Sequence, residues 1–208
     1  MREIPLSFVS EGLLLEAVLS LPAGPGPFPG AVVCHPHPLF GGNMENNVVL
    51  ALARGLVDRG VAALRFNFRG VGRSQGSFGE GVGEQADAKA ALAFLAGREE
   101  VDAGRLAVCG YSFGGMVALA VGCRHEKVLA VAAVSPVVLP GMLHGCSRPV
   151  FIMVGERDNL TPPGHILQEV PAEDEMCRVE VVPGADHFWW GHEEKLAGVA
   201  AFLAGVLR

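Results

Sequence analysis

The sequence has little of what marks a nucleic-acid-binding or membrane-spanning protein. Its 208 residues carry 16 Lys and Arg against 22 Asp and Glu, a formal net charge of -6. The basic residues form no cluster, so we expect no nucleic-acid partner. The longest apolar runs, such as residues 128–134, are too short to span a bilayer. The opening residues, MREIPLSF, lack the apolar core of a signal peptide. We therefore expect no membrane partner either.

The cysteines do not form a recognisable framework. There are five, an odd number, and no C-x-x-C pair occurs, which suggests neither a disulfide framework nor a zinc site. Cys34 and Cys109 stand inside apolar runs, where a thiol behaves as a small hydrophobic group. This usage favours a reducing, cytoplasmic compartment.

The chain shows no repeat, no low-complexity linker and no composition change that would divide it, so a single domain over residues 1–208 is expected. Apolar runs typical of strands alternate with helical stretches such as 45–59 and 83–97. Residues 6–9 and 13–21 predict an antiparallel hairpin at a sheet edge. The pattern predicts an α/β fold with about eight strands, mostly parallel, and helices on both faces. Such sheets place their sites at the carboxyl ends of the strands.

The most informative stretch is Leu106–Met116, LAVCGYSFGGM. A buried strand leads into a G-x-S-x-G turn around Ser112, and an apolar helix follows. A serine in a tight strand-to-helix turn needs small neighbours, and its hydroxyl then projects beside the free N–H groups of the helix. This context predicts that Ser112 is a nucleophile. A Gly-rich turn with an incidental serine is the alternative.

A serine nucleophile needs a base, and the base needs a carboxylate that orients it. The strand at 150–154 leads to Asp158, and the strand at 178–182 leads to His187. We predict His187 as the general base and Asp158 as its partner, in the chain order of α/β-hydrolases. Glu156 and Asp186 are the competing carboxylates. Glu156 comes earlier in its loop, and Asp186 is adjacent to His187 in sequence, a poor position for holding the ring.

An oxyanion hole requires two N–H donors. One is expected from Phe113, which follows the nucleophile. The other is expected from the loop after residues 31–34, where Pro36 and Pro38 have no N–H. His37 is preferred over Leu39 because it lies nearer the strand. His35 and His37 form only two of the ligands that a metal needs, so we expect them to fix this loop, with no metal and no cofactor.

The chain resembles the α/β-hydrolase superfamily in four segments, which are the serine turn GYSFGG and the segments RGVGRS, GERDNLTP and GADHFWWG. The segments CHPHPLFGGNMENNVV and LRFNFRGVGRSQG are similar to those of small bacterial hydrolases related to dienelactone hydrolases and to prolyl-oligopeptidase-type catalytic domains. Dienelactone hydrolases carry a cysteine nucleophile, whereas this chain has Ser112, so their lactone chemistry is not implied. Asn67 stands where many members have an aspartate, which leaves the partner of Arg69 open.

The resemblance implies a serine hydrolase of small carboxylic esters; a thioesterase, a peptidase or a non-catalytic binding protein are the alternatives. Many members insert a lid where this chain has only residues 135–149, so we expect an open, lidless site that takes a small ester or other acyl substrate. The expected substrate-binding residues are Phe40, Tyr111, Val138 and Phe188. Trp189 is expected near them, and Trp189 and Trp190 are candidates for a homodimer contact.

Overall fold

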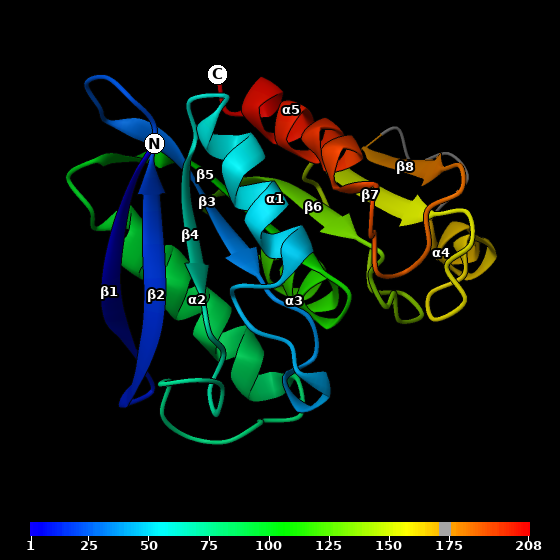
Figure 1. Cartoon of the computed structure of the whole chain (residues 1–208), viewed down its shortest axis with the longest axis horizontal. Coiled ribbons are helices and arrows are strands. Elements are labelled where there is room, and N and C mark those ends of the chain that lie inside the picture. Colours follow the sequence, from blue (N-terminus) through cyan, green and yellow to red (C-terminus); the bar gives the residue numbers. More distant parts are fainter. Residues whose placement is uncertain (171–175) are drawn as a thin grey trace.

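A computed structural model describes residues 1–170 and 176–208. The strands are β1 (Arg2–Ser10), β2 (Leu13–Leu21), β3 (Phe28–Cys34), β4 (Ala62–Phe66), β5 (Val101–Tyr111), β6 (Val128–Val134), β7 (Val150–Gly155) and β8 (Cys177–Val182). The helices are α1 (Asn47–Val57), α2 (Val82–Ala96), α3 (Phe113–Gly122), α4 (Pro163–Glu169) and α5 (Ala197–Val206), with 3-10 turns η1 (Pro38–Phe40) and η2 (Glu193–Leu196). Figure 1 shows their arrangement.

The strands form one sheet in the order β1-β2-β4-β3-β5-β6-β7-β8. β2 is antiparallel to both β1 and β4, and the remaining neighbours are parallel. The predicted eight-stranded, mostly parallel α/β fold is confirmed, and so is the hairpin at one edge. The strand ends were less well predicted, since β5 already begins at Val101, ahead of the apolar run at Leu106.

Helices cover both faces of this sheet. α1 packs against α5 on one face, and α2 packs against α3 on the other (Figure 1). All residues of β4 and β7 are buried, as expected for strands covered on both sides. Each face has its own hydrophobic core. None of the helices in the described parts of the chain is long and apolar enough to cross a membrane.

The order β3-β5-β6-β7-β8 decides where the polar loops meet. Because these strands are parallel, the loops that follow them gather at one edge of the sheet. The connection between β6 and β7, residues 135–149, consists of turns and holds no helix or strand. The structure therefore has no lid domain there, as the length of this connection predicted.

The sequence suggested no disulfide framework, but the structure contains a disulfide bond between one pair of cysteines. Cys123, which follows α3, is bonded to Cys146 in the β6–β7 connection, 23 residues further on. Their proximity depends on the chain folding back past β6, which the spacing of cysteines does not report. Cys34 and Cys109 are buried as predicted, and burial raises the pKa of the Cys109 thiol to about 12. The cytoplasmic compartment stays a prediction.

Arg69, whose partner the sequence left open, is held by a buried carboxylate. Its guanidinium donates to Asp87 of α2 at 2.8 Å, and its backbone N–H donates to the same carboxylate at 3.0 Å. The Asp87 side chain is fully buried, while the second partner of Arg69, Glu11, is exposed. The hydrogen bonds that Arg69 donates to Asp87 raise the pKa of Arg69. The pair fixes the loop after β4 against α2.

Replacing Asp87 with alanine should therefore lower the free energy of unfolding by about 3–5 kcal/mol, because Arg69 would lose its buried partner. The matched control is Arg73→Ala. Its ion pair with Glu16 involves an Arg73 side chain that is 84% exposed, so a change within about 1 kcal/mol is expected. Urea denaturation of the three proteins measures both effects, and equal losses in the two variants would contradict this account.

Candidate functional site

Ser112 lies at the tip of a strained turn between β5 and α3. Its backbone has φ 54° and ψ -119°, a region that non-glycine residues rarely occupy. A Cβ on Gly110 would overlap the carbonyl of Gly114, and one on Gly114 would overlap the carbonyls of Cys34 and His35. Only glycine fits both positions, so the turn packs directly on the end of β3.

Ser112, His187 and Asp158 are brought into contact. His187 Nε2 lies 3.1 Å from Ser112 Oγ, and His187 Nδ1 lies 2.8 Å from Asp158 Oδ2. Because a carboxylate only accepts, Nδ1 carries the proton, and Nε2 is left to accept from the serine hydroxyl. The competing carboxylates are used elsewhere: Glu156 accepts from the N–H of Gly184, and Asp186 accepts from the N–H groups of residues 188 and 189.

Asp158 is a buried carboxylate that stays ionised. Burial acts to raise its pKa, but hydrogen bonds from His187, Thr161 and Ser135 outweigh burial and hold the pKa below its ordinary value. Thr161 contributes twice, through its N–H at 2.8 Å and its hydroxyl at 2.9 Å. The sequence carries a signature of this turn, an Asp followed three residues later by Thr. This spacing is typical of a side chain that hydrogen-bonds to the backbone of its own loop.

Ser135 and Trp189 support this carboxylate, and sequence reasoning missed both roles. Trp189 Nε1 donates to Ser135 Oγ at 3.1 Å, and the Ser135 side chain in turn hydrogen-bonds to Asp158. Both residues are fully buried, and both have positive φ, 44° and 62°. No local pattern predicts this contact, because it joins loops that are 54 residues apart.

The loop that carries His187 is fixed from three sides. The Tyr111 hydroxyl donates to the carbonyl of His187 at 2.7 Å, and Asn47 Nδ2 donates to the carbonyl of Phe188 at 3.1 Å. Asp186 caps the turn from inside. Burial, followed by the charges of Asp158 and Asp186, raises the pKa of Tyr111, so its hydroxyl keeps the proton that it donates.

The loop after β3 is held by His35, as expected. His35 Nε2 accepts from the N–H of Phe68 at 3.0 Å, so Nδ1 carries the proton that is donated to the carbonyl of Pro36 at 2.6 Å. Both ring nitrogens are thus used, and within the described residues no three His, Cys, Asp or Glu side chains are grouped to hold a metal. His37 packs its ring against Phe113 and accepts from the N–H of Leu39.

Three of the four predicted substrate-binding residues line one cavity with Ser112. This cavity has a volume of about 380 Å³, and Phe40, Tyr111 and Phe188 form part of its wall. Val138 does not line it. Val138 lies in a neighbouring cavity of 110 Å³, and Leu160 borders both.

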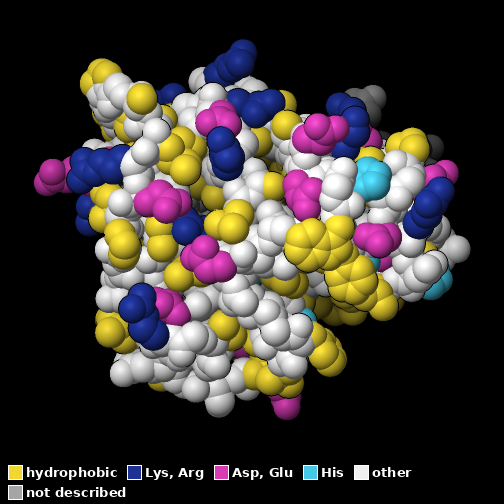
Figure 2. Space-filling view, viewed as in Figure 1, with side chains coloured by type: hydrophobic (Ala, Val, Ile, Leu, Met, Phe, Trp, Pro, Cys, Tyr) yellow, Lys and Arg dark blue, Asp and Glu magenta, His cyan; other side chains and the backbone are white. Residues whose placement is uncertain are grey.

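Trp189 is not the exposed residue that the sequence suggested. Its side chain is 0% exposed, whereas Trp190 is 70% exposed and Phe188 is 53% exposed. The neighbouring side chains of this turn point in different directions. The hydrogen bond that the Trp189 indole N–H donates to Ser135 Oγ holds Trp189 in the interior. Figure 2 shows hydrophobic side chains gathered around the loop that precedes α5. A homodimer through Trp189 is excluded by this burial, and a contact through Trp190 alone stays a prediction.

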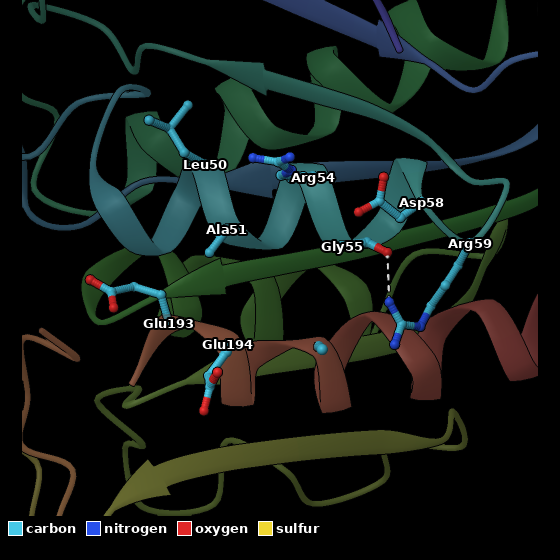
Figure 3. A pocket seen from close by; sticks show the side chains of 9 residues that line it. Leu50, Ala51, Arg54, Gly55, Asp58, Arg59, Glu193 and Glu194 are labelled. Carbon is cyan, nitrogen blue, oxygen red and sulfur yellow. Dashed lines mark hydrogen bonds between the residues drawn. The ribbon is translucent and has the colours of Figure 1, made fainter. Parts of the chain in front are cut away.

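A separate groove of 390 Å³ lies between α1 and the η2–α5 segment (Figure 3). Arg54, Asp58 and Arg59 of α1 and its C-terminal turn stand on one side, and Glu193 and Glu194 stand on the other. Arg59 Nη1 donates to the carbonyl of Gly55 at 3.1 Å. The groove contains none of the predicted site residues, and its charges are of mixed sign.

Comparison with known proteins places the chain among hydrolases. Residues 11–144 match the sequence model of the X-Pro dipeptidyl-peptidase (S15) family. An uncharacterized protein of Rickettsia prowazekii is 37% identical over 172 residues, which cover 77% of this chain and 72% of that protein.

Two solved structures extend the comparison over nearly the whole chain. An α/β serine hydrolase homologue from Coxiella burnetii is 31% identical, with a TM-score of 0.83 over 100% of this chain and 99% of that one. An α/β serine hydrolase without a lid from Xanthomonas campestris is 27% identical, with a TM-score of 0.86 over 99% and 94% of the two chains.

The burial of His35 predicts how stability depends on pH. Burial lowers the pKa of His35 from 6.5 to about 4. Between these values the unfolded chain binds a proton on His35 that the folded chain does not, so the free energy of unfolding falls as the pH falls. The loss is about 1.4 kcal/mol per pH unit, or about 3 kcal/mol over the window.

Urea denaturation of the wild type and of His35→Gln between pH 7 and pH 4.5 isolates this contribution from that of the carboxylates. The stability advantage of the wild type should shrink as the pH is lowered. Parallel curves for the two proteins would show that His35 does not titrate in this way.

Proposed function

Because the chain belongs to the X-Pro dipeptidyl-peptidase (S15) family and has the α/β-hydrolase fold, we propose that it is a serine hydrolase that cleaves small carboxylic esters. Ser112 is the nucleophile, His187 the general base and then acid, and Asp158 the carboxylate that orients His187. The observation that carries the proposal is the continuous contact from Ser112 Oγ to His187 Nε2 at 3.1 Å and from His187 Nδ1 to Asp158 at 2.8 Å.

Two backbone N–H groups are assigned to the oxyanion hole. Phe113 is the first residue of α3, so its N–H has no acceptor within the helix and lies at the positive end of the helix dipole. On the loop after β3, Pro36 and Pro38 have no N–H, and the N–H of Leu39 is engaged by His37 Nδ1. The N–H of His37 is therefore the second donor.

The reaction follows from these positions. His187 Nε2 takes the hydroxyl proton as Ser112 Oγ attacks the ester carbonyl, and the carbonyl oxygen becomes an oxyanion between the N–H groups of Phe113 and His37. The bond to the alcohol then breaks, and His187 gives the leaving oxygen its proton. A water molecule, deprotonated by His187, attacks the acyl-enzyme in the same way and releases the acid and Ser112.

The cavity beside Ser112 supports an ester over a peptide substrate. A dipeptidyl-peptidase must bind the charged amino terminus of its substrate, for which a carboxylate in the site is the natural partner. None of the described residues that line the 380 Å³ cavity is Asp or Glu. Phe40 and Phe188, 86% and 53% exposed, offer apolar surface instead. A thioester forms the same acyl-enzyme and is the second candidate.

Hydrolysis of p-nitrophenyl esters from acetate to decanoate, by the wild type and Ser112→Ala, tests the proposal. Loss of the nucleophile should lower turnover by about 10⁶-fold, and Asp158→Asn should lower it by about 10⁴-fold because His187 would adopt the wrong tautomer. Ser77→Ala, at an exposed serine, is the control that should keep wild-type activity.

Labelling by a fluorophosphonate distinguishes the remaining outcomes, since only an activated serine reacts. Labelling without ester turnover would indicate that the substrate is a thioester or a peptide and not an ester. An absence of both labelling and turnover would favour a non-catalytic binding protein, and full activity of Ser112→Ala would refute the mechanism.

A further inference from the structure

Ser112 lines one of two neighbouring cavities, whose walls come from loops on opposite sides of its strand. β5 has β3 as one neighbour and β6 as the other. The loop after β3 supplies the 380 Å³ cavity with Pro36, His37 and Phe40. The connection after β6 supplies the 110 Å³ cavity with Pro136, Val137 and Val138. The two cavities meet at Leu160.

One lining residue of the smaller cavity packs against the segment that follows Ser112. The N–H of Ser112 donates to the carbonyl of Val134 at 2.9 Å, which fixes the start of the β6–β7 connection against the turn. A Cβ built on Gly115 would lie 3.1 Å from the Cβ of Pro136. Pro136, which lines the cavity, therefore packs on the first turn of α3.

The wall of this cavity suits an alkyl group. Its apolar members are Pro136, Val137, Val138, Leu160, Pro162 and Ile166. The polar members are Thr161, whose hydroxyl is already bonded to Asp158 at 2.9 Å, and His165, which is exposed at the rim. None of the described residues lining it carries a permanent charge.

The proton transfer decides which part of an ester each cavity takes. His187 must deliver a proton to the leaving oxygen, and His187 lines the larger cavity but not the smaller one. The alcohol therefore leaves through the larger cavity, beside Phe188 and Phe40. The acyl chain, on the other side of the carbonyl carbon, is directed toward Pro136 and Val138.

We infer that the 110 Å³ cavity is an acyl subsite, which restricts the proposed esterase to short aliphatic acyl groups carried by larger, apolar or aromatic alcohols. This inference rests on the proposed function. An apolar cavity of about 150 Å³ holds one benzene molecule, so 110 Å³ accommodates a chain of about four carbons. Val138 and Ile166 set the depth of the subsite.

The test is the acyl-chain profile of kcat/KM, from p-nitrophenyl acetate to decanoate, with the leaving group held constant. The wild type should hydrolyse the esters from acetate through butyrate best and lose about tenfold or more by octanoate, since a methylene that an apolar pocket cannot accommodate costs about tenfold. Val138→Phe should lower kcat/KM for butyrate about tenfold or more while leaving acetate within about threefold.

Leu139→Phe is the matched control, because it adds similar bulk one residue further along, at a side chain that is 49% exposed and lines neither cavity. It should reproduce the wild-type profile. Val138→Ala tests the subsite if Val138→Phe does not fold. This variant should shift the preferred acyl-chain length toward longer chains. The inference would be overturned if kcat/KM stayed constant from acetate through decanoate, or if neither Val138 variant changed the acyl-chain profile. In either case, turnover that depends on Ser112 would still support the proposed function.

A second series varies the alcohol at constant butyrate, comparing ethyl with naphthyl esters. Phe188→Ala should lower the preference for the naphthyl ester and leave the acyl-chain profile unchanged. If Phe188→Ala changed the acyl profile instead, the two cavities would have the reverse roles and the inference would be wrong. Failure of the wild type on every ester would remove the proposed function and this inference together.

Discussion

The strained backbone at Ser112 is the constraint on which the rest of the site depends. Such a conformation persists only where the surrounding structure holds it, and here the glycines before and after the serine allow α3 to pack directly on the carbonyls at the end of β3. That contact brings the β3 loop, with its N–H donors, beside the serine hydroxyl. Two further non-glycine residues with positive φ, Ser135 and Trp189, lie in the loops that meet it.

A single directed series of hydrogen bonds connects these loops. The indole of Trp189 donates to the Ser135 hydroxyl, Ser135 supports Asp158, and Asp158 fixes the proton of His187 on Nδ1. Each donor points toward the carboxylate, which keeps Asp158 ionised despite its burial, and Nε2 is left to accept from the Ser112 hydroxyl. Electrostatic preorganisation of this kind acts before a substrate arrives.

The sequence was sufficient for the order of strands and helices, since buried parallel strands leave uninterrupted apolar runs. It also placed Ser112, Asp158 and His187 together, because each follows a strand whose end faces the same edge. It was insufficient for contacts between distant loops. The Cys123–Cys146 bond, the inward turn of Trp189 and the separate cavity of Val138 all depend on how loops pack, which no local pattern records.

The contact between Ser112 and His187 spans 75 residues, and the loop of His187 is anchored to Tyr111 of β5 and to Asn47 of α1. A chain in which β3, β5 and α3 had formed without the loop after β8 would contain Ser112 but no base to ionise it. The chain would expose no active nucleophile to its surroundings until the last strands of the sheet have docked.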